Sequence, residues 1–148
     1  SARAVALAFP AMRLMFLLLL AACATAPASD PADLDIRATV IAEYNVISGP
    51  AGRRDWDRFK ELFAPNAHIG TLTPDEYVEK TKPYLNEHPL FQRPASMKVE
   101  RHGDTARVIV QNESRNASNE EKPFATGHAT FELVHRADAW KIVSIVSQ

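Results

Sequence analysis

The sequence predicts an α+β domain in which helical segments come before an antiparallel sheet. Apolar residues recur at helical spacing in three segments between residues 31 and 88, and capping residues, Gly or Pro bound each segment. After Pro94 the apolar residues alternate with polar ones, which is the period of a strand with one buried face. The length of 148 residues suits one domain, and a hydrophobic fraction of 46% suffices for a packed core.

Charge and cysteine content exclude several classes of protein. With 17 Lys and Arg against 18 Asp and Glu, the formal net charge of −1 argues against nucleic-acid binding, which needs a basic face. The single cysteine allows neither an intrachain disulfide nor a cysteine-based zinc cluster. No apolar run reaches the roughly 20 residues that a membrane-spanning helix requires.

The helical part divides into three predicted helices. The first covers residues 31–48, where Asp30 caps the start and Pro31 fits the first turn. A short second helix covers residues 55–63, with Asp55 as its cap. The third helix begins at the capping box Thr73-Pro74-Asp75-Glu76 and ends at His88-Pro89. The stripe of the first helix that is expected to pack inward consists of Leu34, Ala38, Ile41, Tyr44 and Asn45.

Four strands are predicted over residues 97–102, 105–114, 124–136 and 139–147. Tight turns join the first to the second and the third to the fourth, so neighbouring strands are expected to run antiparallel. The inward residues by side-chain parity are Met97, Val99 and Arg101; Ala106, Val108, Val110, Asn112 and Ser114; Ala125, Gly127, Ala129, Phe131 and Leu133; and Trp140, Ile142, Ser144 and Val146. None of these strand residues is Asp or Glu.

The outward face of the predicted sheet is also apolar, because Ile109, Val143 and Ile145 lie on it. A sheet that is apolar on both faces needs cover on both, so we expect a homodimer through this outer face. Glu113 and Arg115 share the outer face as well, and we expect them to form a salt bridge.

Residues 1–22 predict a secretory signal peptide, with Met12 as an alternative translation start. An apolar block ends in Leu20-Ala21-Ala22-Cys23, which resembles the lipobox of bacterial lipoproteins. Cleavage before Cys23 would leave a lipidated cysteine, a flexible tether over residues 23–31 and a domain over residues 32–148. Because Ala24 follows the cysteine, the resemblance implies the outer membrane, on its periplasmic side, with the lipid as the only membrane contact.

Two stretches resemble the nuclear transport factor 2-like superfamily, including its SnoaL-like members. One runs from Tyr44 through Asp55-Trp56 to the Leu62-Phe63-Ala64-Pro65-Asn66-Ala67 step, and the other covers residues 140–145. The resemblance spans about residues 33–148. It implies a cone-shaped fold in which three N-terminal helices pack in a strongly curved antiparallel sheet. It says little about function, because this fold hosts isomerases, dehydratases, hydrolases and binding modules.

The implied cone can hold a small apolar ligand. Aromatic side chains with a few convergent polar groups are typical of such sites, although each aromatic residue taken singly is also explained as core. The expected ligand-binding residues are Tyr44, Trp56, Phe63, His68, Tyr77, Tyr84, Asn112, Ser114 and Trp140. Neither a metal nor a cofactor is expected, because no ligand spacing or cofactor motif occurs.

Three functions remain open on the sequence alone. The first is non-catalytic binding of a small apolar or amphipathic molecule in the cell envelope, which predicts a closed pocket without a buried carboxylate. The second is an acid–base enzyme (an isomerase, dehydratase or cyclase) with His68 as base and Tyr44 or Tyr77 as acid, which predicts His68 inside the cone. The third is a structural, dimeric interaction module with a filled cone. The absence of an inward acid on the strands favours the first.

Overall fold

The computed structural model describes residues 29–148, so the predicted leader, Cys23 and most of the tether lie outside the described residues. The elements, in chain order, are α1 (Pro31–Ile47), α2 (Trp56–Glu61), β1 (Phe63–Ile69), α3 (Pro74–Glu87), β2 (Phe91–His102), β3 (Thr105–Arg115), β4 (Ala125–Arg136) and β5 (Ala139–Ser147). The mixed α+β class is therefore confirmed. Within these residues, no helix is both long and apolar enough to cross a membrane.

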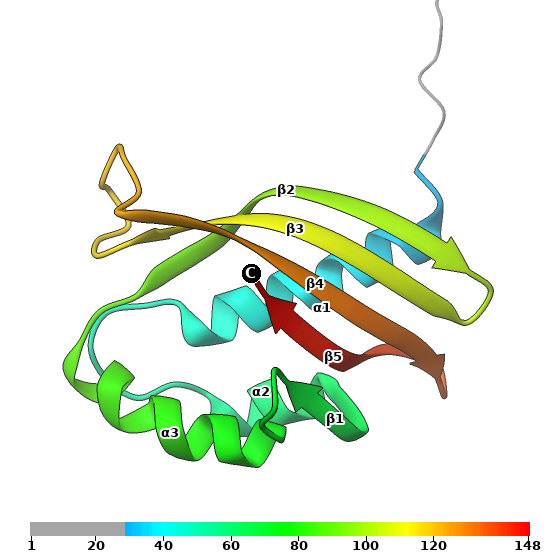
Figure 1. Ribbon diagram of the computed structural model, residues 1–148, viewed down its shortest axis with the longest axis horizontal. Helices are drawn as coiled ribbons and strands as arrows, with labels where there is room; N and C mark the ends of the chain where they lie inside the picture. Colours follow the sequence, from blue (N-terminus) through cyan, green and yellow to red (C-terminus); the bar gives the residue numbers. More distant parts are fainter. Residues whose placement is uncertain (1–28) are drawn as a thin grey trace, which may run out of the picture.

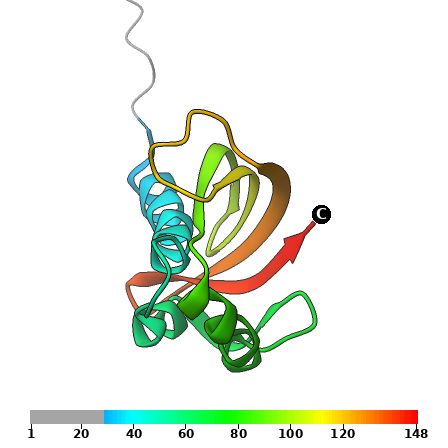
Figure 2. The same ribbon diagram turned by 90° about the vertical axis from the view of Figure 1, so that its left-hand side faces the viewer.

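The five strands form one sheet in the order β1-β5-β4-β3-β2. The pairs β2–β3, β3–β4 and β4–β5 are antiparallel, as predicted, although β2 begins at Phe91 and not at Met97. Strand β1 lies between α2 and α3, at the Leu62–Ala67 step where the family resemblance implies the first strand. It corrects the prediction in one respect, because it pairs parallel with β5. The sheet is strongly bent, and α1 lies along its concave side (Figures 1 and 2). In Figure 1, helices α2 and α3 lie with β1 below α1.

The helix starts follow the predicted caps. The Asp55 carboxylate accepts a hydrogen bond from the Arg58 N–H at 3.0 Å, at the start of α2. At the start of α3, the Thr73 N–H donates to the Glu76 carboxylate at 2.8 Å, and the Glu76 N–H donates to the Thr73 hydroxyl at 3.2 Å. This reciprocal pair satisfies two N–H groups that have no partner within the helix. Local side-chain chemistry thus determines where these two helices begin.

Helix α1 turns a different face inward from the predicted one. Its buried residues are Ile36, Val40, Glu43, Tyr44 and Ile47. Leu34 and Ile41, both expected inside, are 52% and 39% exposed. Arg101 on β2 bonds to the Asp33 carboxylate at 3.2 Å, which ties the first turn of α1 to the sheet. The packing of Ile36, Val40 and Ile47 in the core sets the rotation of the helix, and the spacing of its apolar residues does not reveal it.

The inward face of β3 is as predicted, since Ala106, Val108, Val110, Asn112 and Ser114 are buried. Strand β5 departs from the prediction at Val143. Leu133 pairs with Ile142, whereas Glu132 pairs with Ser144, so Val143 is an extra residue in β5. Such a bulge reverses side-chain parity beyond it. Ile145 is therefore buried and Val146 is 48% exposed, the opposite of the prediction for both.

Candidate ligand site inside the cone

The structure places the predicted ligand-binding residues in three groups. The buried ones are Tyr44, Phe63, Asn112, Ser114 and Trp140, the partly buried ones are Trp56 and Tyr77, and the exposed ones are His68 and Tyr84. Tyr84 is 58% exposed and stacks on His88 at the end of α3, so it faces away from the interior. His68 lies on an exposed part of β1, so it is not the base inside the cone that the second alternative required.

Tyr44 and Asn112 meet in the interior from opposite sides. The Asn112 amide Nδ2 donates a hydrogen bond to the Tyr44 hydroxyl at 3.2 Å, which joins α1 to β3. The Tyr44 ring also lies 5.8 Å from the Phe131 ring on β4. Both residues were expected at the site, and their contact provides a fixed polar point within an apolar core.

Glu43 is the interior residue that the sequence analysis missed. It lies on α1 directly before Tyr44, is only 5% exposed, and forms no hydrogen bond or ion pair with any residue in 29–148. Burial without a partner favours the uncharged form and raises the pKa of Glu43 to about 8. Side-chain parity identifies inward acids on strands alone, and Glu43 lies on a helix. The spacing of Glu43 from Val40 and Ile47 on α1 is the signal that would have found it.

Two tyrosines, Tyr44 and Tyr77, lie close enough to Glu43 for its charge to affect their pKa values. Desolvation raises the pKa of both Tyr44 and Tyr77 to about 12, and the nearby Glu43 carboxyl adds to the increase at each. The Tyr77 ring stacks on Phe59 with 5.5 Å between ring centroids. Both phenols therefore keep their protons at neutral pH and remain hydrogen-bond donors.

Trp56 carries a buried polar atom without a partner among the described residues. Its indole Nε1 is sealed from solvent and meets no acceptor among the described residues. The Trp56 ring packs edge-on against Phe59, 5.6 Å away, so the same aromatic ring contacts both Trp56 and Tyr77. Buried polar atoms nearly always have a partner, so the Trp56 N–H is a group that a water or a ligand would satisfy.

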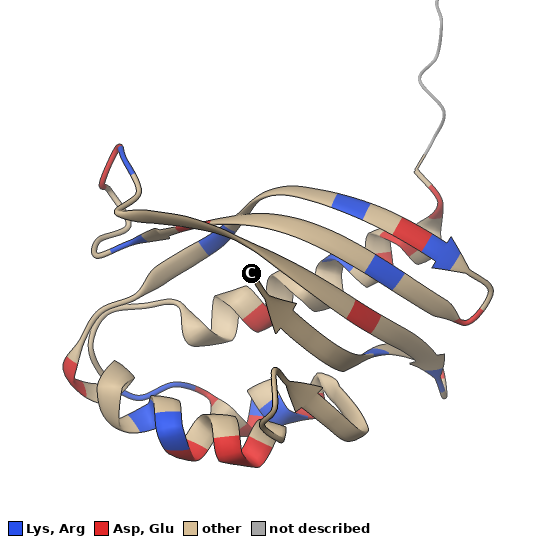
Figure 3. Ribbon diagram, in the orientation of Figure 1, with Lys and Arg blue, Asp and Glu red and all other residues tan. Residues whose placement is uncertain are grey.

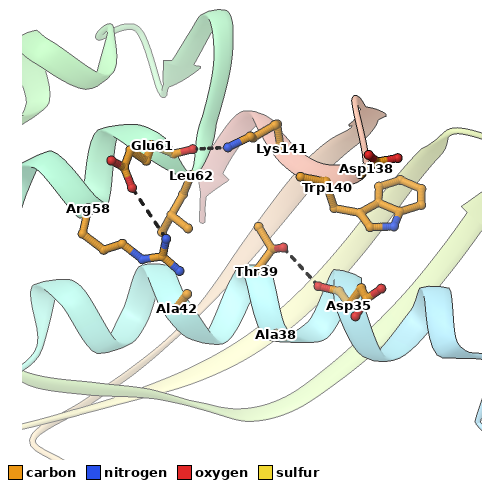
Figure 4. A pocket seen from close by; sticks show the side chains of 11 residues that line it. Asp35, Ala38, Thr39, Ala42, Arg58, Glu61, Leu62, Asp138, Trp140 and Lys141 are labelled. Carbon is orange, nitrogen blue, oxygen red and sulfur yellow. Dashed lines mark hydrogen bonds and ion pairs between the residues drawn. The ribbon is translucent and has the colours of Figure 1, made fainter.

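A groove at the surface of α1 is separate from this interior. It has a volume of about 530 Å³ and runs between α1, α2 and β5, and its α1 wall is formed by Asp35, Ala38, Thr39 and Ala42 (Figure 4). The Lys141 ammonium group, which lies at the groove, already donates a hydrogen bond to the Glu61 carbonyl oxygen. Neither Glu43 nor Tyr77 lines the groove, so it is a surface feature separate from the interior acid.

The remaining charged candidates have structural roles. Arg115 Nη1 donates to the Glu113 carboxylate at 2.8 Å, so the predicted salt bridge is present. Arg115 and Arg93 hold the pKa of Glu113 below its usual value. Within residues 29–148, no group of three or more His, Cys, Asp and Glu side chains is placed to hold a metal ion.

Comparison with known proteins identifies the fold. No family model matches the sequence, and no curated protein matches it. An NTF2-like protein of unknown function from Pseudomonas putida superposes with a TM-score of 0.64 at 15% identity, covering 81% of this chain and 87% of that one. The protein Aln2 from a Streptomyces species gives a TM-score of 0.66 at 13% identity, covering 82% and 92%. A Shewanella frigidimarina structure provisionally described as a ketosteroid isomerase gives 0.56 at 15% identity, covering 81% and 96%.

At these identities the likeness concerns the path of the chain and not its chemistry. The bent five-stranded sheet around α1, together with these superpositions, establishes that residues 29–148 have the nuclear transport factor 2-like fold.

Proposed function

We propose that this domain binds a small, mostly apolar molecule inside the cone, with the Glu43 carboxyl as its main polar contact. The observation that carries the proposal is a glutamate that is only 5% exposed in the core and whose pKa is raised to about 8 by burial. Burial disfavours the charged form of this carboxyl, so keeping it there is a cost to the fold once it ionises. A chain that retains this cost in its core has a reason to do so, and a bound molecule that pairs with the carboxyl supplies one. The sequence analysis expected a pocket without a buried carboxylate, and buried Glu43 corrects that expectation.

The chemistry of the site limits the ligand. With a pKa of about 8, the Glu43 carboxyl is mostly protonated at pH 7, so it donates one hydrogen bond and accepts others. The Tyr77 phenol, whose pKa of about 12 keeps it protonated, is a further donor. Phe59 stacks on Tyr77, and Phe131 lies beside Tyr44, so the rings next to these phenols are apolar. A compact molecule with one carbonyl or hydroxyl group and an apolar body fits this environment.

Native mass spectrometry of the membrane-extracted protein tests the proposal. We expect a small molecule to co-purify with the wild type and with Glu79→Gln, which changes an exposed glutamate on α3. Glu43→Leu replaces the carboxyl with an apolar side chain and should lose the molecule. Equal occupancy in Glu43→Leu, or no bound molecule in the wild type, would refute the proposal and favour a filled cone.

A second candidate is acid–base catalysis, and the pKa of about 8 at Glu43 favours it. A carboxyl group that titrates near neutral pH can both take and return a proton at a carbon next to a carbonyl. Glu43 would replace His68 as the base. The test is deuterium exchange at the α-carbon of cyclohexanone, followed by NMR. Catalysis predicts exchange that increases with pH up to about 8 and is abolished in Glu43→Gln, whereas a binding protein shows no exchange above buffer.

We further propose that the chain is an exported lipoprotein, anchored through Cys23 to the outer membrane, and that it forms a homodimer through the outer face of the sheet. The lipid anchor is supported by the lipobox-like sequence. The dimer is supported by the exposed apolar side chains of Ile109, Val143 and Val146. Mass spectrometry of intact extracted protein would detect acyl chains on Cys23. Light scattering should give a dimer mass for the wild type and a monomer mass for Val146→Lys.

A further inference from the structure

We propose that the end of the sheet next to the loop of residues 116–124 carries a separate site for a small organic anion with a carboxylate group. A hollow of about 230 Å³ lies there, where β2 begins and β3 ends. Its lining residues are Ser48, Phe91, Gln92, Arg93, Arg115 and Ser118. At about 30 Å³ per water, this volume holds roughly seven or eight waters, which suits a small acid and is too small for most drug-sized ligands.

The charge of the lining is of one sign. Arg93 and Arg115 are the charged residues that line the hollow, and no Asp or Glu does. Figure 3 shows basic positions on both strands at this end of the sheet. Both guanidinium groups contact one carboxylate, that of Glu113, at 3.3 Å from Arg93 and 2.8 Å from Arg115. One negative charge shared between two positive ones leaves the pair able to take a second carboxylate.

Arg115 is held in place as a binding group. Its side chain is 7% exposed. Its Nε donates to the Glu120 carbonyl oxygen at 3.0 Å, and its Nη1 donates to Glu113. Its Nη2 donates to no described residue. The Glu120 carboxylate accepts from the Asn116 N–H at 2.9 Å, so that acid is occupied within the loop. A guanidinium fixed by two of its nitrogens loses little freedom when the third binds a ligand.

The rest of the hollow is equally well ordered. The Ser48 hydroxyl donates to the Gln92 carbonyl oxygen at 2.6 Å and accepts from the Gln92 N–H at 2.9 Å, which ties the end of α1 to β2. The Gln92 amide Nε2 donates to the Ser114 hydroxyl at 3.1 Å. Phe91 supplies an apolar wall, and Ser118 supplies a hydroxyl at the loop. Arginine beside an aromatic ring suits a carboxylate with a short apolar body, such as an aromatic acid.

Titration with benzoate, observed by NMR chemical shifts, tests this site, and benzamide serves as the uncharged probe of the same shape. We expect benzoate to shift the amide signals of Gln92 and Ser118, which line this hollow, in a saturable way, and benzamide to leave these signals unchanged. Arg93→Gln and Arg115→Met should each weaken benzoate about tenfold or more, the scale of one charge-assisted contact. Arg93 is 67% exposed, so Arg93→Gln should leave the fold intact even where Arg115→Met does not.

Arg107→Gln is the matched control, because Arg107 pairs with Glu132 on the outer sheet face at 2.8 Å and lines no part of this hollow. It should leave benzoate affinity at this hollow unchanged. Three outcomes would overturn the proposal: equal binding of benzamide, unchanged benzoate affinity in Arg93→Gln, or equal weakening by Arg107→Gln.

Discussion

Replacing Glu43 by Gln should remove a large part of the pH dependence of stability. In the unfolded chain this carboxyl titrates near 4.5, and in the folded chain burial raises its pKa to about 8. Between these values the folded state holds a proton that the unfolded state has released. Stability therefore falls as pH rises through this range, because the proton-binding state is the folded one. The contribution is fully present below about pH 4.5 and is lost above about pH 8.

The magnitude follows from the two pKa values. They differ by about 3.5, and each pH unit corresponds to about 1.4 kcal/mol, so ionising Glu43 costs the fold up to about 5 kcal/mol. That is a large share of the 5–15 kcal/mol by which domains are typically stable.

Glu113 changes the pH dependence of stability in the opposite direction. The pKa of Glu113 is lowered by its hydrogen bond with Arg115, so its contribution is lost as pH falls.

Urea unfolding at pH 5, 7 and 9, on wild type and Glu43→Gln, isolates the effect, because contributions of the other groups cancel in the difference. The variant should gain stability relative to the wild type by several kcal/mol between pH 5 and pH 9. Glu79→Gln, which changes an exposed glutamate, should follow the wild type. Parallel curves for wild type and Glu43→Gln would show that the carboxyl is solvated or paired, and the reasoning about the interior site would fail.

Three further changes have defined outcomes in the same unfolding assay at pH 7. Trp56→Phe should cost less than about 1.5 kcal/mol, because the indole N–H it removes has no partner among residues 29–148; a larger loss would reveal a partner. Phe131→Ala should cost about 3–5 kcal/mol, since this side chain is 1% exposed and fills the middle of the core. Thr73→Ala should cost about 1 kcal/mol through loss of the capping box, and a value near zero would show that the cap is redundant.

Features with a local cause could be predicted from the sequence. The capping box at Thr73 places the start of α3 correctly, because the bonds that form it lie within four residues. The bounds of β5, Ala139–Ser147, follow from a turn and a run of alternating residues, and they match the prediction. The inward set on β3, from Ala106 to Ser114, is correct because that strand has no bulge. In each case neighbours in the chain supply the determining contacts.

The interior acid could not be found in this way, because the rotation of α1 is decided by distant contacts. Apolar residues occur on several sides of this helix, so spacing alone does not choose between a face through Leu34 and one through Ile36. The packing of Ile36 and Val40 in the core with residues of the sheet makes the choice. Once Ile36 and Val40 are inward, Glu43 must be inward too, at seven residues and three residues along the same face. Because the predicted inward face of α1 was the wrong one, the sequence did not predict that Glu43 is buried.

The bulge at Val143 has a comparable effect on the other side of the molecule. Because Val143 is an extra residue, Ile145 reaches the interior opposite Phe131 on β4, and the core gains a large side chain there. The same reversal places Val146 on the outer face beside Thr130, which in turn pairs with Ile109. A regular β5 would bury Val146 and expose Ile145. The outer face therefore remains apolar in either register, so the argument for a partner subunit does not depend on the parity of β5, whereas the composition of the core does.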